Sequence, residues 1–487
     1  MLPDPLFAAL QHHAAQFPNA LALSDNQRQV DYAQLWLDVE ARAGQLRALG
    51  APLLALALNN GCEALIWDLA ALRAGVACLI LPPFFSPAQR AHCLEQSGAT
   101  LALAEGPFAM ELAPLGFVAA GEFWRRESAP AGLPLPAGTA KITYTSGTTG
   151  APKGVCLSAE AMLRVAAELE LVSRECAPQR YMAVLPLAVL LENLGLYAAL
   201  IAGATLHLPT QQELGMSVAG SVEWPKLFGQ MLQRGCQSLI LVPQLLFGLV
   251  VAVERGFVPA TGFRFIAVGG ARVSPELLER AQRVGLPVFE GYGLSECASV
   301  VCLNRPGAQR PGTVGRPLPH VQVRLAEDGE VLVAGSTLLG YLGDEPFAGQ
   351  WWPTGDIGEF DADGYLSLRG RKKHQFVTSF GRNVNPEWVE AELTQGGVLM
   401  QAFVYGESLP SNVALLWPLD PNCADAAIEA AVQKANAGLP DYARVGRWVR
   451  LDTAFSPANG LLTANGRPKR EAILARYREH FSEPVNA

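Results

Sequence analysis

The most informative segment of this chain reads Tyr144-Thr145-Ser146-Gly147-Thr148-Thr149-Gly150-Ala151-Pro152-Lys153-Gly154. It begins at the end of a short run, Lys141 to Tyr144, that predicts a strand. Its hydroxyls, flexible glycines and single cation can together surround phosphate oxygens, with help from backbone N–H groups. The spacing is not that of a Walker A loop, and a merely flexible linker would not require Lys153 behind Pro152. The segment therefore predicts a phosphate-binding loop.

Upstream of this loop, short apolar runs alternate with a helix-like stretch. The runs Leu53 to Leu56 and Val76 to Leu81 flank the segment Glu63 to Arg73, which we interpret as an amphipathic helix. This alternation is typical of βαβ units, which place their strands in a parallel sheet.

Downstream of the loop, the pattern predicts more strands of two kinds. Ser238 to Val242 and Phe263 to Val268 each predict a strand that leads into a helix. Val321 to Tyr341 instead predicts short antiparallel strands around Asp328-Gly329. We therefore expect a large α/β region with parallel sheets and a β-rich end.

The length of the chain indicates more than one domain, because 487 residues exceed the size at which one hydrophobic core stops growing. Beyond Gly370 the pattern changes to a compact mix of strands and helices. This part includes an amphipathic stretch, Asp425 to Ala437, and a loop-rich tail, Phe455 to Arg470. We expect an α/β fold with a large N-terminal domain, residues 1–369, and a small α+β C-terminal domain, residues 370–487.

Composition and charge narrow the classes of function. With 37 basic and 45 acidic residues, the net charge of −8 provides no broad positive surface for nucleic acid or anionic lipid. The nine cysteines lack CxxC spacing and predict neither a disulfide framework nor a zinc site. The N-terminus lacks a signal-peptide pattern, and the most apolar stretch, Ser238 to Val253, is too short to span a bilayer. We expect a cytoplasmic protein without a transmembrane segment or a nucleic-acid partner.

Four further motifs follow the loop. They are Gly269-Gly270-Ala271, Glu290-Gly291-Tyr292-Gly293-Leu294-Ser295-Glu296, Thr354-Gly355-Asp356 and Gly370-Arg371-Lys372-Lys373. In this order the motifs resemble those of the AMP-forming acyl and aryl ligases, a family that includes acyl-CoA synthetases, luciferases and the adenylation domains of peptide synthetases. The resemblance extends from about Gln11 to about Tyr477. It implies an enzyme that uses ATP and Mg²⁺ to convert a carboxylic acid into an acyl-adenylate.

The resemblance implies a role for each matching residue. Tyr292 would offer an aromatic face to adenine, Asp356 would accept from the ribose hydroxyls, and Arg371 would donate to the sugar or to phosphate. Glu296 would hold Mg²⁺, and Lys153 would help to stabilise the transition state. The full set expected to contact the nucleotide is Thr145, Ser146, Gly147, Thr148, Thr149, Gly269, Gly270, Ala271, Glu290, Gly291, Tyr292, Gly293, Ser295, Asp356 and Arg371.

The resemblance also implies that the C-terminal domain moves during the reaction. Members of the family rotate the small domain about a hinge so that a thiol can attack the acyl-adenylate. The hinge lies near Arg371 to Lys373, and Lys373 matches the hinge position, although a solvated surface lysine would look the same in the sequence. We therefore expect the C-terminal domain to be mobile.

The chain departs from the family pattern in the loop Leu462 to Arg470. Arg467 stands where the family keeps its adenylation lysine, and Lys469 follows two residues later. Arg467 has a forked reach to phosphate, and Lys469 would face the same side of an extended loop. We favour Arg467 as the catalytic cation that contacts phosphate; Lys469 in that role is the second alternative, and inefficient adenylation is the third. Ala159 and Val189 also stand where many members carry histidine.

The sequence says less about which acid is the substrate and which group accepts the acyl chain than about the nucleotide site. The segments Leu185 to Asn193 and Arg310 to Pro319 look most like those of fatty acyl-CoA synthetases. We therefore expect an aliphatic acid in an acyl pocket that includes Val189 and Glu192, although core packing also explains such apolar residues. The expected acceptor is the thiol of CoA or the phosphopantetheine arm of an acyl carrier protein. Transfer to an amine or a hydroxyl, and a non-catalytic nucleotide-binding protein, are the alternatives.

Overall fold

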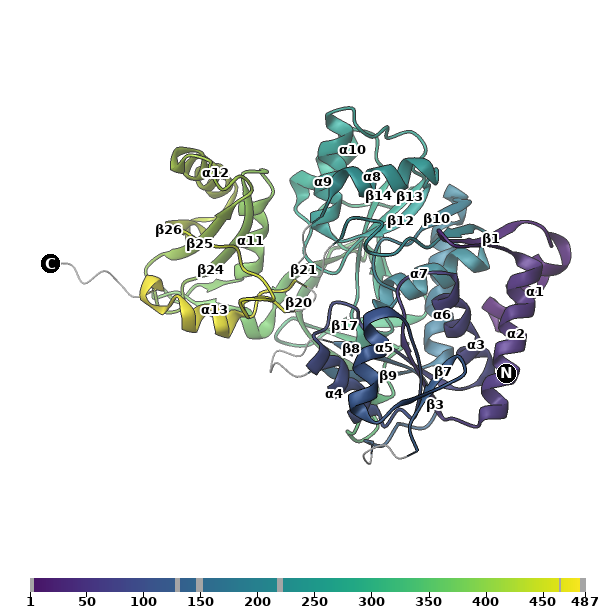
Figure 1. The fold of residues 1–487 in the computed structure, drawn as a ribbon. Coiled ribbons are helices and arrows are strands. Elements are labelled where there is room, and N and C mark those ends of the chain that lie inside the picture. The colour runs from purple at the N-terminus through teal and green to yellow at the C-terminus, as the bar shows by residue number, and fades with distance from the viewer. Residues whose placement is uncertain (1–3, 128–131, 146–151, 217–221, 464–465, 482–487) are drawn as a thin grey trace.

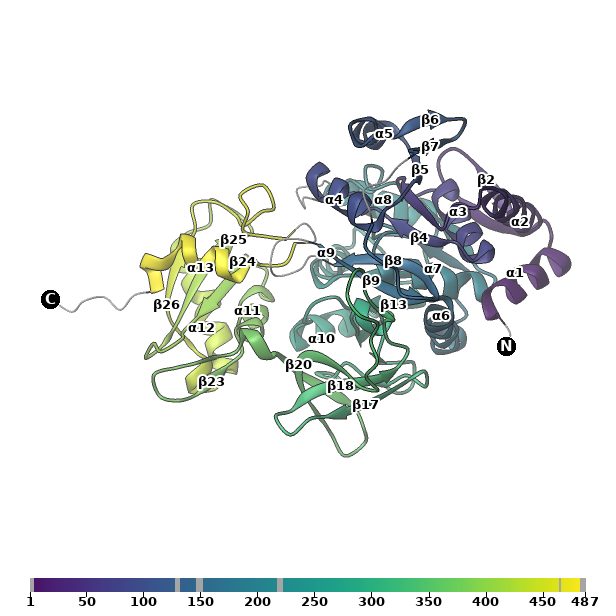
Figure 2. The same cartoon turned by 90° about the horizontal axis from the view of Figure 1, so that it is seen from below.

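The computed structural model describes residues 4–127, 132–145, 152–216, 222–463 and 466–481. It consists of a large N-terminal domain, in which two sheets have parallel central strands and antiparallel edges, and a smaller C-terminal domain (Figure 1). The C-terminal domain, drawn in yellow-green, lies beside the large domain near β20 (Trp352–Phe360) and β21 (Leu366–Arg371), and the turned view in Figure 2 separates the same two bodies. The expected α/β fold is confirmed.

The first sheet carries the phosphate loop. Its strand order is β19-β9-β8-β4-β3-β5-β7-β6, and β3, β4, β5 and β8 pair in parallel. Its strands are β3 (Leu53–Ala57), β4 (Ala77–Ile80), β5 (Leu101–Ala104), β6 (Val118–Ala120), β7 (Phe123–Arg125), β8 (Thr139–Thr145), β9 (Lys153–Ser158) and β19 (Gly340–Tyr341). The connecting helices are α3 (Cys62–Ala74), α4 (Pro87–Ser97) and α5 (Gly106–Leu112). The predicted βαβ units are therefore confirmed, and β9 returns antiparallel to β8.

Helix α3 is not the amphipathic helix that the sequence suggested. Every residue from Ala64 to Ala71 is buried, because the helix packs against α2 (Tyr32–Leu49) as well as against the sheet. Its one charged residue in this stretch, Asp68, forms an ion pair with Lys141 at 2.6 Å and accepts from the Tyr197 hydroxyl at 2.6 Å. A buried carboxylate is tolerated only with such partners. The interpretation of this segment as an amphipathic helix is wrong, because Asp68 does not face solvent. It is buried and paired with Lys141 and Tyr197.

The second sheet shares a buried core with the first. Its strand order is β16-β15-β14-β13-β12-β10-β11-β1-β2. Its strands are β1 (Leu21–Ser24), β2 (Gln29–Asp31), β10 (Arg180–Met182), β11 (Thr205–His207), β12 (Ser238–Leu241), β13 (Phe265–Val268), β14 (Val288–Tyr292), β15 (Cys302–Leu303) and β16 (Arg316–Pro317). The surrounding helices are α1 (Pro5–Gln16), α2, α6 (Ala159–Ser173), α7 (Leu190–Ile201), α8 (Trp224–Gln233), α9 (Pro243–Glu254) and α10 (Pro275–Arg283). One cluster of buried side chains includes Leu54 of the first sheet and Leu239 of the second.

The β-rich end and the C-terminal domain follow. An antiparallel sheet contains β17 (Val321–Leu325), β18 (Glu330–Gly335), β20 and β21, which confirms the antiparallel strands predicted around Asp328-Gly329. The C-terminal elements are β22 (Phe376–Val377), β23 (Asn383–Val384), α11 (Pro386–Thr394), β24 (Leu399–Tyr405), β25 (Asn412–Pro418), α12 (Asp425–Gly438), β26 (Val445–Arg450) and α13 (Arg470–Arg476). Two buried clusters in this domain contain only residues from Phe376 onward, so it has a core of its own.

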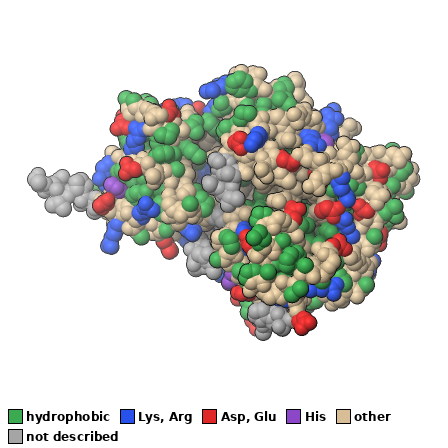
Figure 3. Space-filling model, in the orientation of Figure 1, with side chains coloured by type: hydrophobic (Ala, Val, Ile, Leu, Met, Phe, Trp, Pro, Cys, Tyr) green, Lys and Arg blue, Asp and Glu red, His purple; other side chains and the backbone are tan. Residues whose placement is uncertain are grey.

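The surface carries charges of both signs. On the face drawn in Figure 3, basic and acidic side chains lie interspersed. No helix in the described ranges combines the length and the hydropathy needed to cross a bilayer.

A buried histidine at the end of β11 makes the fold sensitive to acid. His207 is 7% exposed, and neither ring nitrogen has a hydrogen-bond partner among the described residues. Burial, with Arg234 and Arg180 nearby, lowers its pKa from 6.5 to about 4. The folded state therefore favours the neutral ring, and the associated stability is present above pH 6.5 and lost as the pH falls towards 4.

We expect His207→Leu to weaken the acid dependence of stability, since leucine has no proton to bind. The wild-type chain should lose at most about 3 kcal/mol through this residue between pH 7 and pH 4.5. The measurement is the urea midpoint of unfolding at both pH values, with His12→Leu, an exposed histidine, as the control. Equal pH dependence in the wild type and His207→Leu would contradict this account.

Candidate functional site

Glycine-rich turns follow two neighbouring parallel strands. Gly269 and Gly270 come directly after β13, and Gly291 lies in β14, which pairs with β13. A Cβ at Gly269 would lie 3.2 Å from the carbonyl oxygen of Gly291, and Gly270 has a φ of +81°. Glycine permits both features without strain. With Ala271 exposed just beyond them, these strand ends present accessible backbone of the kind to which ligands bind in α/β sheets.

Three residues that the sequence singles out form one polar chain beside these turns. Asp356 in β20 lies directly opposite Arg371 in β21. Asp356 Oδ1 forms an ion pair with Arg371 Nε at 2.9 Å, and the Tyr292 hydroxyl donates to Asp356 Oδ2 at 2.6 Å. Arg371 Nη1 also donates to the Thr354 carbonyl at 3.0 Å. Because each carboxylate oxygen has two lone pairs, Asp356 can still accept a ribose hydroxyl.

Burial affects two members of this chain, Asp356 and Tyr292. It raises the pKa of Asp356 above its ordinary value, while Arg371 and Tyr292 oppose the shift. Tyr292 is 9% exposed, so only a small part of its ring is accessible. The expectation that Tyr292 offers a face to adenine stays a prediction.

Tyr341 joins the expected metal carboxylate to the expected phosphate-loop lysine. Its hydroxyl donates to Glu296 Oε1 at 2.8 Å, and Lys153 Nζ lies 5.4 Å from the centre of its ring. Tyr341 is placed there because β19 pairs with β9, where it lies opposite Val155. Sequence reasoning misses this residue, since the contact depends on two strands that are far apart in the chain.

The phosphate loop itself is described only at its ends. Ser146, Gly147, Thr148 and Thr149 lie outside the described residues. Thr145 is half-buried at the end of β8, and Lys153 is exposed at the start of β9. The phosphate-binding role of the loop stays a prediction.

The turn after β14 is tightly packed. A Cβ at Gly293 would overlap the carbonyl oxygen of Ser299. Ala298 and Ser299 have φ values of 50° and 82°, which are uncommon for residues with a side chain. Such strain persists where the surrounding structure fixes the backbone, and it is concentrated at functional sites. Here it accompanies the 3₁₀ turn Ser295–Cys297, which carries Glu296.

Glu296 fits a magnesium ion bound through a nucleotide. The carboxylate is half-buried, and apart from the bond from Tyr341 it makes no side-chain hydrogen bond or ion pair with a described residue. The described part of the chain contains no group of three or more His, Cys, Asp and Glu side chains placed to hold a metal. Mg²⁺ commonly binds one or two carboxylates and takes its other ligands from phosphate and water. The residues present therefore suit Mg²⁺ held jointly with a triphosphate.

Two predicted site residues are buried acids. Burial raises the pKa values of Glu290 and Glu192 to about 8. Glu192 is fully buried and accepts from the Tyr181 hydroxyl at 2.5 Å and from the Leu185 N–H at 2.8 Å. Its carboxyl group therefore holds the Leu185 segment in place and is not open to a ligand. Val189, half-buried at the start of α7, remains the candidate for an acyl pocket.

The C-terminal domain contributes Arg467 to the site. Its Nη2 atom donates to the carbonyl oxygen of Gly270 at 3.0 Å. The Arg467 side chain is exposed to solvent, although other charged groups lie near its guanidinium group. Burial and the neighbouring Arg371 lower its pKa, while acidic groups that include Asp356 and Glu296 oppose the shift.

Lys469, the alternative cation, lies elsewhere in the loop. It precedes α13, and its backbone N–H donates to the Leu461 carbonyl at 2.9 Å. Its side chain forms no hydrogen bond or ion pair with a described residue. Of the two cations, the structure brings Arg467 to the glycine-rich turns.

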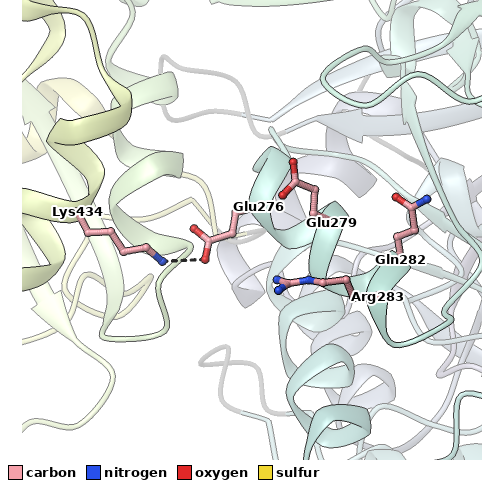
Figure 4. Close-up of a pocket in the computed structure, with 5 residues that line it drawn as sticks. All are labelled: Glu276, Glu279, Gln282, Arg283 and Lys434. Atoms are coloured by element: carbon pink, nitrogen blue, oxygen red, sulfur yellow. Dashed lines mark hydrogen bonds and ion pairs between the residues drawn. The ribbon is translucent and has the colours of Figure 1, made fainter.

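A second contact joins the domains away from these turns. Lys434 of α12 forms an ion pair with Glu276 of α10 at 2.8 Å (Figure 4). The pair borders an open cleft of about 780 Å³ that is also lined by Glu279, Gln282 and Arg283. Two contacts thus hold the described orientation of the domains: the ion pair between Lys434 and Glu276, and the hydrogen bond from Arg467 to the Gly270 carbonyl.

Comparison with known protein families gives matches over most of the chain. A sequence model described as AMP-binding enzyme matches residues 10–342, and one described as AMP-binding enzyme C-terminal domain matches residues 373–483. A long-chain-fatty-acid–CoA ligase of Mycobacterium bovis is 32% identical over 43% of this chain, a match that spans 40% of that relative. A 2-succinylbenzoate–CoA ligase of Bacillus licheniformis is 29% identical over 82% of this chain and 86% of its own length.

Solved structures share the fold. An anthranilate CoA ligase in complex with anthranoyl-AMP superposes with a TM-score of 0.82 at 18% identity, covering 97% of this chain and 96% of that chain. The O-succinylbenzoate coenzyme A synthetase of Bacillus subtilis, in complex with ATP and magnesium ion, gives a TM-score of 0.75 at 24% identity, with coverages of 95% and 98%. At these identities the likeness concerns the fold alone.

We expect Arg467→Ala to weaken ATP binding about tenfold, because a charge-assisted contact to phosphate would be lost. Lys469→Ala, the matched change in the same loop, should alter affinity less than about twofold. Isothermal titration with ATP and Mg²⁺ measures both. A larger loss for Lys469→Ala than for Arg467→Ala would reverse the assignment.

Tyr341→Phe should raise the Mg²⁺ concentration needed for ATP binding by about tenfold, because Glu296 loses the hydroxyl that orients it. Titration of Mg²⁺ at fixed ATP gives this midpoint. Tyr442→Phe removes the same hydroxyl from an exposed tyrosine and serves as the control. An unchanged midpoint in Tyr341→Phe would show that the hydrogen bond does not support a metal site.

Proposed function

The chain belongs to the AMP-binding enzyme family, and on that premise we propose that it activates a carboxylic acid with ATP and transfers the acyl group to a thiol. The observation that carries the proposal is the contact between Arg467 and the Gly270 carbonyl at 3.0 Å. This contact brings a cation of the C-terminal domain to the glycine-rich turns, where the charges of Asp356 and Glu296 act on it. Groups from both domains are thus available to one nucleotide.

The first step joins the acid to AMP. A carboxylate oxygen of the acid attacks the α-phosphorus of ATP, the bond to the β-phosphate oxygen breaks, and pyrophosphate leaves. Because a negative nucleophile approaches phosphate, cations must reduce the repulsion and stabilise the transition state. Lys153 and Arg467 are the side chains placed for this role, and Mg²⁺ at Glu296 would supply further positive charge.

The second step releases AMP. The sulfur of the acceptor thiol attacks the acyl carbon, the bond to the AMP oxygen breaks, and the thiol proton is lost. We propose that the C-terminal domain, for which residues 370–487 are the expected bounds, is mobile, and that its part beyond Lys373 rotates about that residue so that Arg467 withdraws and the thiol enters. Asp356 and Arg371 would keep the sugar and phosphate of the adenylate in place meanwhile.

The acid is proposed to have an apolar body, and an aliphatic chain is the specific form favoured by the segment Leu185 to Asn193. Relatives named for a long-chain fatty acid and for 2-succinylbenzoate support an acid of either aliphatic or aryl type. Both relatives are named as CoA ligases, so CoA is the proposed acceptor, with a carrier-protein phosphopantetheine arm as the alternative.

Acid-dependent exchange of labelled pyrophosphate into ATP tests this function. The panel contains fatty acids of several lengths, 2-succinylbenzoate and anthranilate, and product analysis follows with CoA or a holo carrier protein. We expect exchange with at least one acid and thioester formation with CoA. Exchange without a thioester would indicate an amine or hydroxyl acceptor, and no exchange with any acid would contradict the proposal.

A further inference from the structure

Two residues at the junction of the domains, Lys372 and His374, make contacts with different domains. Arg371 and Lys372 are bound by the large domain. Lys372 Nζ forms ion pairs with Asp328 and with Glu330, the latter at 3.0 Å. Glu330 also accepts the Gly355 N–H at 2.9 Å, so it is fixed by the backbone next to Asp356. Because two carboxylates bind the one ammonium group of Lys372, its side chain is held in a more defined position than in an isolated surface ion pair.

His374 is held by the C-terminal domain instead. Its Nδ1 atom lies 2.6 Å from Glu387 Oε1, in the first turn of α11. The backbone N–H of Glu387 donates to Asn385 Oδ1 at 3.0 Å, which fixes the start of the helix. Burial acts to raise the pKa of Glu387, but His374, Arg470 and Arg371 outweigh it and lower the value. Glu387 is therefore a charged acceptor for the histidine.

Lys373 lies between these two residues, and its side chain is not bound to the described part of either domain. Its side chain is exposed and makes no hydrogen bond or ion pair with any residue in the described ranges. The 3₁₀ turn Lys372–His374 thus contains one free side chain flanked by two that are fastened to different domains.

From this arrangement we propose that Lys372 and His374 are positioning residues that confine the domain rotation to the backbone of Lys373. The inference rests on the proposed function, in which such a rotation separates the two steps. Rotation about Lys373 leaves the Lys372 pairs in the large domain and the His374 pair in the C-terminal domain intact. A pivot at either neighbour would break one of them, so the anchors limit the number of orientations that the C-terminal domain samples.

Other contacts across the junction behave differently. The Asn385 side chain donates to the Arg369 carbonyl, and a Cβ at Gly370, which has a φ of +122°, would fall on the Asn385 amide. This contact and the Arg467 and Lys434 contacts all join the two domains, so rotation must break them. These contacts between the domains favour the described orientation. The Lys372 and His374 pairs, in contrast, define the axis of the domain rotation.

Distance distributions between spin labels test the proposal on the full chain without any substrate. Labels introduced as unnatural amino acids at Phe257 and Ala430, both exposed, report the orientation of the domains. We expect His374→Ala and Lys372→Met to broaden the distribution, and His374→Gln and Lys372→Arg, which keep a donor, to restore its width. Gln375→Ala, whose side chain makes no hydrogen bond in the described structure, is the matched control.

The two half-reactions give a second readout. His374→Ala should slow thioester formation from presynthesised acyl-adenylate by about fivefold, while pyrophosphate exchange changes less than about twofold, because the described orientation keeps its other contacts. His374→Gln should recover the rate. Unchanged widths, or broadening that neither conservative variant reverses, would overturn the proposal. A wild-type chain without any exchange would contradict the proposed function alone, since the distance measurements need no catalysis.

Discussion

The ion pair between Asp356 and Arg371 is the interaction on which the rest of the site depends. It crosses from β20 to β21 at a point where the carboxylate is buried, so losing the arginine would leave a charge without its partner. Through Asp356 the pair orients Tyr292 at the end of the second sheet. Through Arg371 it fixes the residue at which the chain leaves the large domain. One pair thus connects the end of β14, beside the glycine-rich turns, with the domain junction.

The charges of the site come from three separate parts of the chain. Lys153 and Tyr341 belong to the first sheet, Glu296 lies between strands β14 and β15 of the second sheet, and Arg467 belongs to the C-terminal domain. No single part combines the cations and carboxylates that phosphoryl chemistry requires. A guanidinium group suits the position of Arg467, because one nitrogen can bind the Gly270 carbonyl while others remain free to donate to phosphate. The departure from lysine in this loop is therefore compatible with a complete site.

The sequence allowed the fold class, the βαβ units and the strands around Asp328-Gly329 to be predicted, because these rest on local patterns of apolar and turn residues. It also indicated Asp356 and Arg371, whose cross-strand contact the structure then revealed. It did not reveal Tyr341, which reaches Glu296 only through strand pairing. It misjudged α3, since a buried charge such as Asp68 looks like a solvated one until its partners are known. The choice between Arg467 and Lys469 likewise required the path of the loop.

The separate core of the C-terminal domain has a consequence for how such proteins diversify. Because its buried side chains all come from Phe376 onward, this unit does not depend on apolar packing from the large domain. Recombination between genes near the junction would exchange the entire lid-like unit while leaving both hydrophobic interiors intact. The polar contacts between the domains, such as Arg467 with the Gly270 carbonyl and Lys434 with Glu276, would then need to match.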